Sequence, residues 1–230
     1  MVKKYILICL CLSSVSFMYG QKTEFKPEWN VGVGFGPTFS AVDFEPRVST
    51  KSRSQFHGGI AVRYLSEKNL GIIAELNYSQ QGWEQNFKND NEREFQHSHQ
   101  LNYLELPILT HIYFGNKVRF VFNLGPKIGY LISDSEKINE PLAEFLASGS
   151  ASGDFVTQQY YRLADRKIDY GLMAGMGLEF RTGIGSFTLE GRYSFGLGDI
   201  YKSGKSGSSN FSRSANRVIS AKLTYYVKLF

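Results

Sequence analysis

Apolar and polar residues alternate along almost the whole chain after Gln21. In the first such segment Trp29 and Val31 share one parity with the apolar residues that follow, while Gly32 and Gly34 take the other. A period of two residues is typical of a β-strand whose two faces meet different surroundings. No window after Gln21 shows the apolar stripe of a long amphipathic helix. The pattern therefore predicts an all-β protein.

Eight segments carry this alternation, and each is close to or above the roughly 9 to 11 residues that a tilted strand needs to cross a bilayer. Named by their apolar residues, they run from Trp29 to Phe39, Phe56 to Tyr64, Leu70 to Tyr78, Leu104 to Phe114, Val118 to Tyr130, Ile168 to Phe180, Phe187 to Leu197 and Ile219 to Leu229. We predict about eight strands. Ten strands remain an alternative if part of Asp154 to Asp165 pairs with a neighbouring segment.

The connections between these segments alternate in length. The short links are Ser66 to Asn69, Gly115 to Lys117 and Arg181 to Gly185, and the long polar ones are Ala41 to Gln55, Glu84 to Gln100, Ile132 to Asp165 and Gly198 to Ala215. Outer-membrane barrels have short periplasmic turns and longer external loops. The pattern predicts a transmembrane antiparallel up-and-down β-barrel with both termini in the periplasm.

A soluble barrel alternates in the same way, so parity alone does not decide which face meets water. The many glycines of the polar parity suit a cramped interior. Aromatic residues also stand near the strand ends, where membrane-interface girdles lie; they are Trp29, Tyr64, Tyr78, Trp83, Phe114, Tyr130 and Tyr225. These features favour lipid outside over a soluble periplasmic ligand-binding barrel.

The first twenty residues have the order of a secretory signal. Lys3 and Lys4 precede the apolar run Tyr5 to Leu12, and small residues lead up to Gly20. The run is too short for a membrane-spanning helix, which needs roughly 20 apolar residues. We expect a signal peptide over residues 1–20, an outer-membrane β-barrel domain over residues 21–230, and localisation in the cell outer membrane.

Composition excludes some classes of function. Both cysteines, Cys9 and Cys11, fall in the expected signal, so the mature chain has no disulfide or thiolate metal site. Its 24 basic and 21 acidic residues, after removal of Lys3 and Lys4 from totals of 26 and 21, are too even to indicate nucleic acid. With 18 Phe, 14 Tyr and 23 Gly, the aromatic residues are spread along the chain as in a barrel.

The polar parity carries many charged residues, which we interpret as a structural ion-pair network in the lumen. An eight-stranded barrel is just wide enough for side chains to fill, and buried charges there must be paired. A proton pathway or an acid/base pair is a weaker alternative. The network comprises Arg63, Glu75, Glu105, Arg119, Lys127, Glu179, Glu190, Arg192 and Lys222. We predict no catalytic residue and no cofactor.

His97 and His99 fall in the second long link, beside acidic residues that end at Glu94. We interpret them as part of a solvated loop, because two histidines without further ligands are a weak metal signal, and predict no metal site. His57 and His111 are expected to be hydrogen-bonded filling of the interior. The third long link, Ile132 to Asp165, is where we would expect any external partner to bind, unless the loop is mobile; it contains an aromatic-bearing run from Asp154 to Leu163.

Four stretches resemble the PorT family of outer-membrane β-barrel proteins of Bacteroidetes. They are Tyr103 to Leu109, Asn123 to Tyr130, Gly175 to Phe180 and Leu189 to Leu197. The resemblance implies an integral barrel, and the namesake is associated with protein secretion by the type IX system. It implies as partners outer-membrane lipids, the barrel-assembly machinery and secretion-system proteins. Substrates of the barrel-assembly machinery commonly end in an aromatic residue on the outward parity of the last strand. Phe230 departs from this pattern, because it lies on the parity of Lys228 and not on that of Leu229.

The sequence thus predicts a non-enzymatic barrel that assists protein secretion or envelope assembly. The alternative is a lipid-modifying barrel enzyme, which would need a Ser-His-acid arrangement. No such arrangement can be singled out among many loop serines and four histidines.

Overall fold

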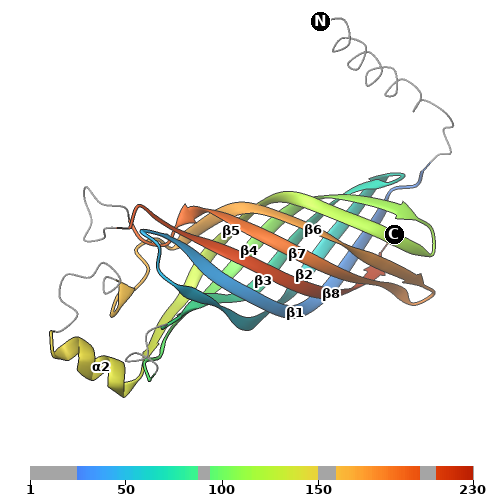
Figure 1. Cartoon of the computed structure of the whole chain (residues 1–230). Coiled ribbons are helices and arrows are strands. Elements are labelled where there is room, and N and C mark those ends of the chain that lie inside the picture. The colour runs from blue at the N-terminus through green and yellow to red at the C-terminus, as the bar shows by residue number, and fades with distance from the viewer. Residues whose placement is uncertain (1–24, 88–93, 150–158, 203–210, 230) are drawn as a thin grey trace, which may run out of the picture.

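The computed structural model describes residues 25–87, 94–149, 159–202 and 211–229. Eight antiparallel strands form a closed barrel in sequence order, in which β8 pairs with β1 (Figure 1). The strands are β1 Glu28–Glu45, β2 Thr50–Glu67, β3 Leu70–Gln85, β4 His97–Gly115, β5 Val118–Ile138, β6 Ile168–Thr182, β7 Gly185–Asp199 and β8 Arg213–Lys228. The predicted eight-stranded up-and-down barrel is confirmed.

The apolar parity faces outward and the polar parity faces inward. Val33 and Leu189 are 60% and 57% exposed, whereas the charged Arg63 is 1% exposed. A soluble protein has the opposite distribution, and an outward apolar band around a polar interior is the mark of a membrane barrel. Each strand pairs with a neighbour on both sides, so the barrel has no open sheet edge, as a membrane requires.

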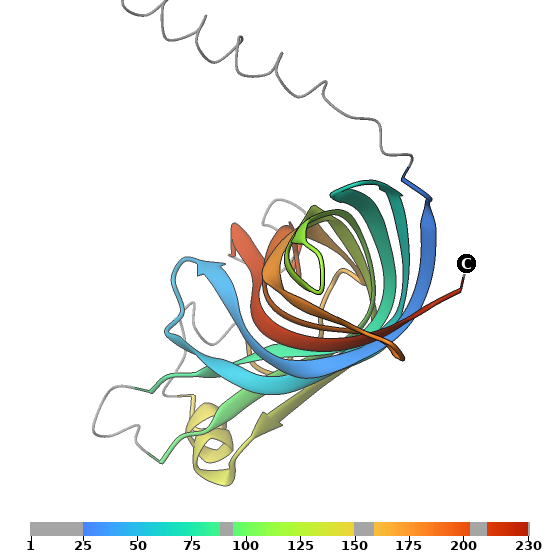
Figure 2. The same ribbon diagram turned by 90° about the vertical axis from the view of Figure 1, so that its right-hand side faces the viewer.

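The three short connections lie together at one end of the barrel, which we call the turn end. They join β2 to β3, β4 to β5, and β6 to β7, and Figure 2 views the barrel from this end. Strand β1 begins and β8 ends here, as an even strand count requires. The opposite end, which carries the long connections, is called the loop end below.

All four predicted long loops are wrong in their bounds, because the strands continue beyond the apolar band. Strand β1 runs to Glu45 and β2 begins at Thr50, so most of the predicted loop Ala41 to Gln55 is strand. Strand β4 begins at His97, which pairs with Ile138 at the end of β5. Outside the hydrocarbon layer an outward face has no need of apolar residues, so polar side chains continue the ladder without alternating.

A short helix, α2 (Glu140–Ala147), follows β5 in what the sequence predicts as an irregular loop. Asn139 stands at its N-cap and joins it to the segment before β4: its side chain accepts a hydrogen bond from the Gln96 N–H (2.9 Å) and donates one to the Glu94 carbonyl (2.6 Å). Leu142 is buried. Among the described residues no helix is long and apolar enough to cross a membrane.

The outward apolar band generates a prediction about Leu124, which is 48% exposed near the middle of the apolar run of β5. Leu124→Arg is expected to lower the free energy of unfolding by about 2–4 kcal/mol, the cost of a cationic side chain near the bilayer midplane. The measurement is denaturant unfolding of the barrel folded into lipid vesicles.

The matched control is Ser135→Arg, which places the same charge at an exposed position of β5 beyond the band. Its effect should stay within about 0.5 kcal/mol, as for an ordinary surface substitution. Equal losses for the two variants would show that β5 does not cross lipid at Leu124.

Candidate functional site

The barrel interior contains all nine residues of the predicted ion-pair network, and each is at most 6% exposed. They come from every strand except β1. The structure arranges them in three groups, one in the middle of the barrel, one nearer the turn end and one nearer the loop end.

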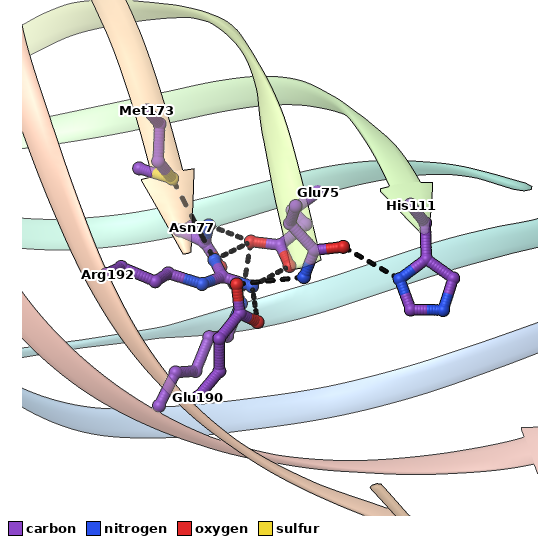
Figure 3. A network of polar contacts seen from close by, with 8 residues as sticks. Glu75, Asn77, His111, Met173, Glu190 and Arg192 are labelled. Carbon is purple, nitrogen blue, oxygen red and sulfur yellow. Dashed lines mark hydrogen bonds and ion pairs between the residues drawn. The ribbon is translucent and has the colours of Figure 1, made fainter. Parts of the chain in front are cut away.

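The central group is built around Glu75 of β3 and Arg192 of β7 (Figure 3). Arg192 donates to both carboxylate oxygens of Glu75, at 2.7 and 2.8 Å, and to Glu190 at 2.8 Å. Lys222 Nζ donates to Glu75 Oε2 at 2.8 Å. Strands β3 and β7 are four apart in a ring of eight. This bidentate ion pair therefore joins opposite walls of the barrel.

The group nearer the turn end repeats this arrangement. Arg63 of β2 donates to Glu179 of β6 at 3.1 Å, and Arg119 lies 3.9 Å from the same carboxylate. The Arg63 guanidinium also lies over the Tyr226 ring, 4.1 Å from its centroid. Because β2 and β6 are again four strands apart, a second ion pair spans the bore.

The group nearer the loop end joins neighbouring strands. Lys127 donates to Glu105 at 2.6 Å and lies 3.3 Å from Asp169. Gln81 also donates to Glu105, at 2.8 Å. With Asp169 included, the three groups contain five basic and five acidic side chains. The interior charge is therefore balanced, as the high cost of an unpaired buried charge demands.

Little space remains among these side chains. The cavity between Glu105, Lys127 and Arg192 has a volume of about 10 Å³, close to the smallest that holds one water molecule. Glycines give the charged side chains room: a Cβ at position 175 would lie 2.1 Å from Glu190 Oε1, and one at position 34 would lie 2.7 Å from Lys222 Cε. Among the residues that the structure describes, side chains thus fill the bore.

Two of the four histidines take part in this filling, and the predicted hydrogen bonding is confirmed for His111 but not for His57, whose buried Nδ1 has no partner. His111 Nδ1 lies 2.7 Å from Asn123 Oδ1, and Asn123 in turn donates to Glu190 at 2.8 Å. His57 is buried in the bore and lines the small cavity.

An apolar cluster that the sequence analysis missed closes the loop end. Its buried members are Val42, Phe44, Val48, Trp83, Leu101, Tyr103, Leu131, Ile200, Tyr201 and Phe211. They come from strand extensions and connections, where alternation no longer marks the inward face. Burial, together with the charge of Asp134, raises the pKa of the Tyr201 hydroxyl, which therefore stays neutral at physiological pH.

Trp83 corrects one of our girdle predictions. It is fully buried in this cluster, and its indole N–H donates to Gln159 at 3.0 Å. Residues 81 to 83 are buried in succession, so the alternation breaks at Gly82, whose φ of +147° favours glycine. The other six girdle aromatics face outward at least in part.

The third long link, Ile132 to Asp165, where we predict that a partner binds, lies partly outside the described residues, which omit 150–158. Gln159 is buried and accepts the hydrogen bond from the Trp83 indole N–H. Tyr160 donates to Gln85 at 2.6 Å, so these two side chains bind the barrel. Tyr161 and Leu163 are exposed.

His97 and His99 correct the prediction of a solvated loop. They begin strand β4 and are 3% and 0% exposed. His97 Nε2 lies 2.7 Å from Glu136 Oε1, and His99 Nε2 contacts Asp134. The prediction fails because β4 and β5 pair beyond the apolar band and turn these residues inward.

Comparison with known proteins agrees with this architecture. The sequence model of a family described as "outer membrane protein beta-barrel domain" matches residues 19–202. No curated protein sequence matches the chain.

Similar solved structures include OprG from Pseudomonas aeruginosa, with 11% identity over 87% of this chain and 95% of that one and a TM-score of 0.49. Ail, the attachment invasion locus protein of Yersinia pestis, has 12% identity over 87% and 99% of the two chains and a TM-score of 0.41. Neisserial surface protein A has 11% identity over 87% and 99% and a TM-score of 0.44.

The central ion pairs generate a prediction about stability. Glu75→Gln is expected to lower the free energy of unfolding by about 3–5 kcal/mol, because it leaves Lys222 and half of the Arg192 fork without a buried counter-charge. The measurement is the denaturant midpoint and slope of the refolded barrel in detergent micelles.

Glu28→Gln is the matched control, because Glu28 pairs with Arg181 and Lys228, each at 3.3 Å, at the more exposed turn end. Its loss should be at most about 1 kcal/mol, as for surface ion pairs. If the two variants lose the same small amount, the interior charges do not hold the barrel together.

Proposed function

We propose a role for this chain, which belongs to the outer membrane protein β-barrel domain family. It is a non-enzymatic outer-membrane protein that serves an envelope complex. The observation that carries the proposal is the closed interior. Ten paired charges fill the bore and an apolar cluster closes its loop end, which leaves about 10 Å³ at the centre. A barrel without a passage acts through its two ends, where it meets aqueous partners.

The most specific version of this role is an accessory of protein secretion, which the resemblance to the PorT family supports. Strands β4 and β5 extend past the apolar band, and with α2 they form a raised rim at the loop end (Figure 1). Outer-membrane lipids surround the band. We further propose that the barrel-assembly machinery inserts the chain after export through a signal peptide, whose residues lie outside the described part.

The surroundings of the histidines support a non-enzymatic role over a lipid-modifying enzyme. His57 and His111 are enclosed in the bore, where a membrane lipid has no access. His97 and His99 each contact a carboxylate through Nε2, the atom that would have to activate a serine in a hydrolytic triad. Deletion of the gene is therefore expected to leave lipid A and phospholipid profiles unchanged by mass spectrometry.

The closed bore generates a prediction about transport. Purified protein inserted into planar bilayers should give no stepwise conductance, because the ion pairs leave no continuous water path. A trimeric porin reconstituted in the same way is the positive control. Regular conductance steps that depend on protein dose would show that the bore opens in the membrane and would favour a diffusion channel.

Site-specific cross-linking tests the partner role, since the expected mature chain contains no cysteine. Single cysteines at Lys137, on the exposed part of the loop-end rim, and at Lys68, in the β2–β3 turn, report on the two ends separately. We expect a discrete adduct with another envelope protein from at least one of them, and reduced export in a deletion strain. Normal secretion together with no adduct from either position would contradict the proposal.

A further inference from the structure

His97, His99 and Glu136 lie close together at the loop end. Each offers one ligand atom, and these atoms all lie within 4.8 Å of one another. His97 and His99 point to the same side of β4 because they are two residues apart, and Glu136 is paired with His99 across the ladder. Among the described residues, no other group of three or more His, Cys, Asp or Glu side chains is close enough to hold a metal ion.

Both imidazole rings are buried, and in each ring only one of the two nitrogens has a hydrogen-bond partner. His97 and His99 are 3% and 0% exposed, and the Nδ1 atom of each is buried without a hydrogen-bond partner. A buried polar atom without a partner costs roughly 1–3 kcal/mol and calls for an explanation. Two such atoms in neighbouring rings point to a ligand that uses their lone pairs.

Asp134 and Trp83 hold His99 in place. The Asp134 carboxylate contacts His99 Nε2, and its other oxygen accepts the Ala164 N–H at 2.6 Å. The Trp83 indole stacks on the His99 ring, with centroids 4.5 Å apart and planes 8° apart. A carboxylate on one ring nitrogen fixes the tautomer that leaves the other bare, which is the usual second-sphere arrangement of a metal-bound histidine.

The charge of the cluster favours a cation. The side-chain ion-pair partners of Asp134 and Glu136 are the two histidines, whereas every acidic group of the bore faces Lys or Arg. Histidines that bind a metal do so as neutral imidazoles, so the ion itself would supply the positive charge beside these two carboxylates. A divalent ion balances the two charges.

We propose that His97, His99 and Glu136 bind a divalent transition-metal ion, with Asp134 as a positioning residue for His99. Two imidazoles and a carboxylate suit Zn²⁺, which such ligands hold at about 2.0–2.2 Å, and not Ca²⁺ or Mg²⁺, which take oxygen ligands. Three protein ligands leave the fourth position of the ion open.

The site has a path from solvent. A cavity of about 490 Å³ lies beside it, lined by His97 together with Lys51, Glu84, Phe95 and Lys137 among others. The ion enters from this cavity, outside the membrane band. Binding therefore does not require the barrel to open.

The first experiment is isothermal titration of the refolded, untagged barrel with ZnCl₂. We expect one Zn²⁺ per chain. His97→Gln, His99→Gln and Glu136→Gln should each weaken binding by about 100-fold or more, and Asp134→Asn by about 10- to 100-fold, as for second-sphere residues. The control is His111→Gln in the bore, for which affinity should stay within about twofold.

Refolding of every variant is verified by the heat-sensitive gel shift of folded barrels. Asp134→Asn and Glu136→Gln keep both imidazoles and almost the same volume, so they test the site even if a histidine variant does not fold. Absence of Zn²⁺ binding by the wild type, or equal loss in His111→Gln, overturns the proposal.

The second experiment uses Trp83 as a reporter, because Trp29 and Trp83 are the two tryptophans of the chain. In a Trp29→Phe background, one equivalent of Cu²⁺, a fluorescence quencher of the same ligand preference, should quench Trp83, and excess Zn²⁺ should restore the emission. Trp29 lies near the start of β1, at the turn end, so the reverse variant, Trp83→Phe, should show no quenching. Equal quenching of both variants would place the ion elsewhere.

Discussion

Charge pairing across the bore is the interaction on which this barrel depends. Lipid outside requires apolar residues at every second position, and the narrow interior of eight strands must then be filled by the remaining side chains. Glu75 and Arg192, and Glu179 and Arg63, connect opposite walls. Because whole domains are stable by only about 5–15 kcal/mol, a pair whose disruption costs about 3–5 kcal/mol strongly limits which single interior charges can change.

Filling the interior also limits what the protein can do. The same side chains that hold the walls together leave no path for a solute, so selection for stability and selection for transport conflict in a barrel of this size. Function then moves to the ends, where the strands leave the bilayer and their side chains are free of both constraints. The raised rim of β4, β5 and α2 is the part of the described chain in which these constraints no longer apply.

The sequence predicts the membrane-spanning part well and the loop end poorly, for a physical reason. Lipid imposes a period of two, so the outward position of Leu124 and the inward position of Glu75 follow from parity alone. Beyond the bilayer that signal disappears, and His97 then looks like a loop residue although it is paired strand. Trp83 was misplaced because Gly82 changes the parity, and nothing in a single sequence reveals which glycine does so. Parity also does not show that Glu75 meets Arg192 from the opposite wall, since that depends on strand register and tilt.

Buried carboxylates need a nearby positive charge both in the bore and at the loop end, but different groups supply it. In the bore, five acidic side chains are matched by five Lys and Arg side chains on the same inward parity, so the balance is permanent and built into the fold. At the loop end, Asp134 and Glu136 face histidines, whose neutral form supplies no counter-charge. Their balance must come from bound protons or from a bound cation. Because His99 is held by Asp134 on one nitrogen and by Trp83 on its face, its remaining nitrogen has a fixed direction beside a second imidazole and a carboxylate, which is the geometry that the proposed metal ion uses.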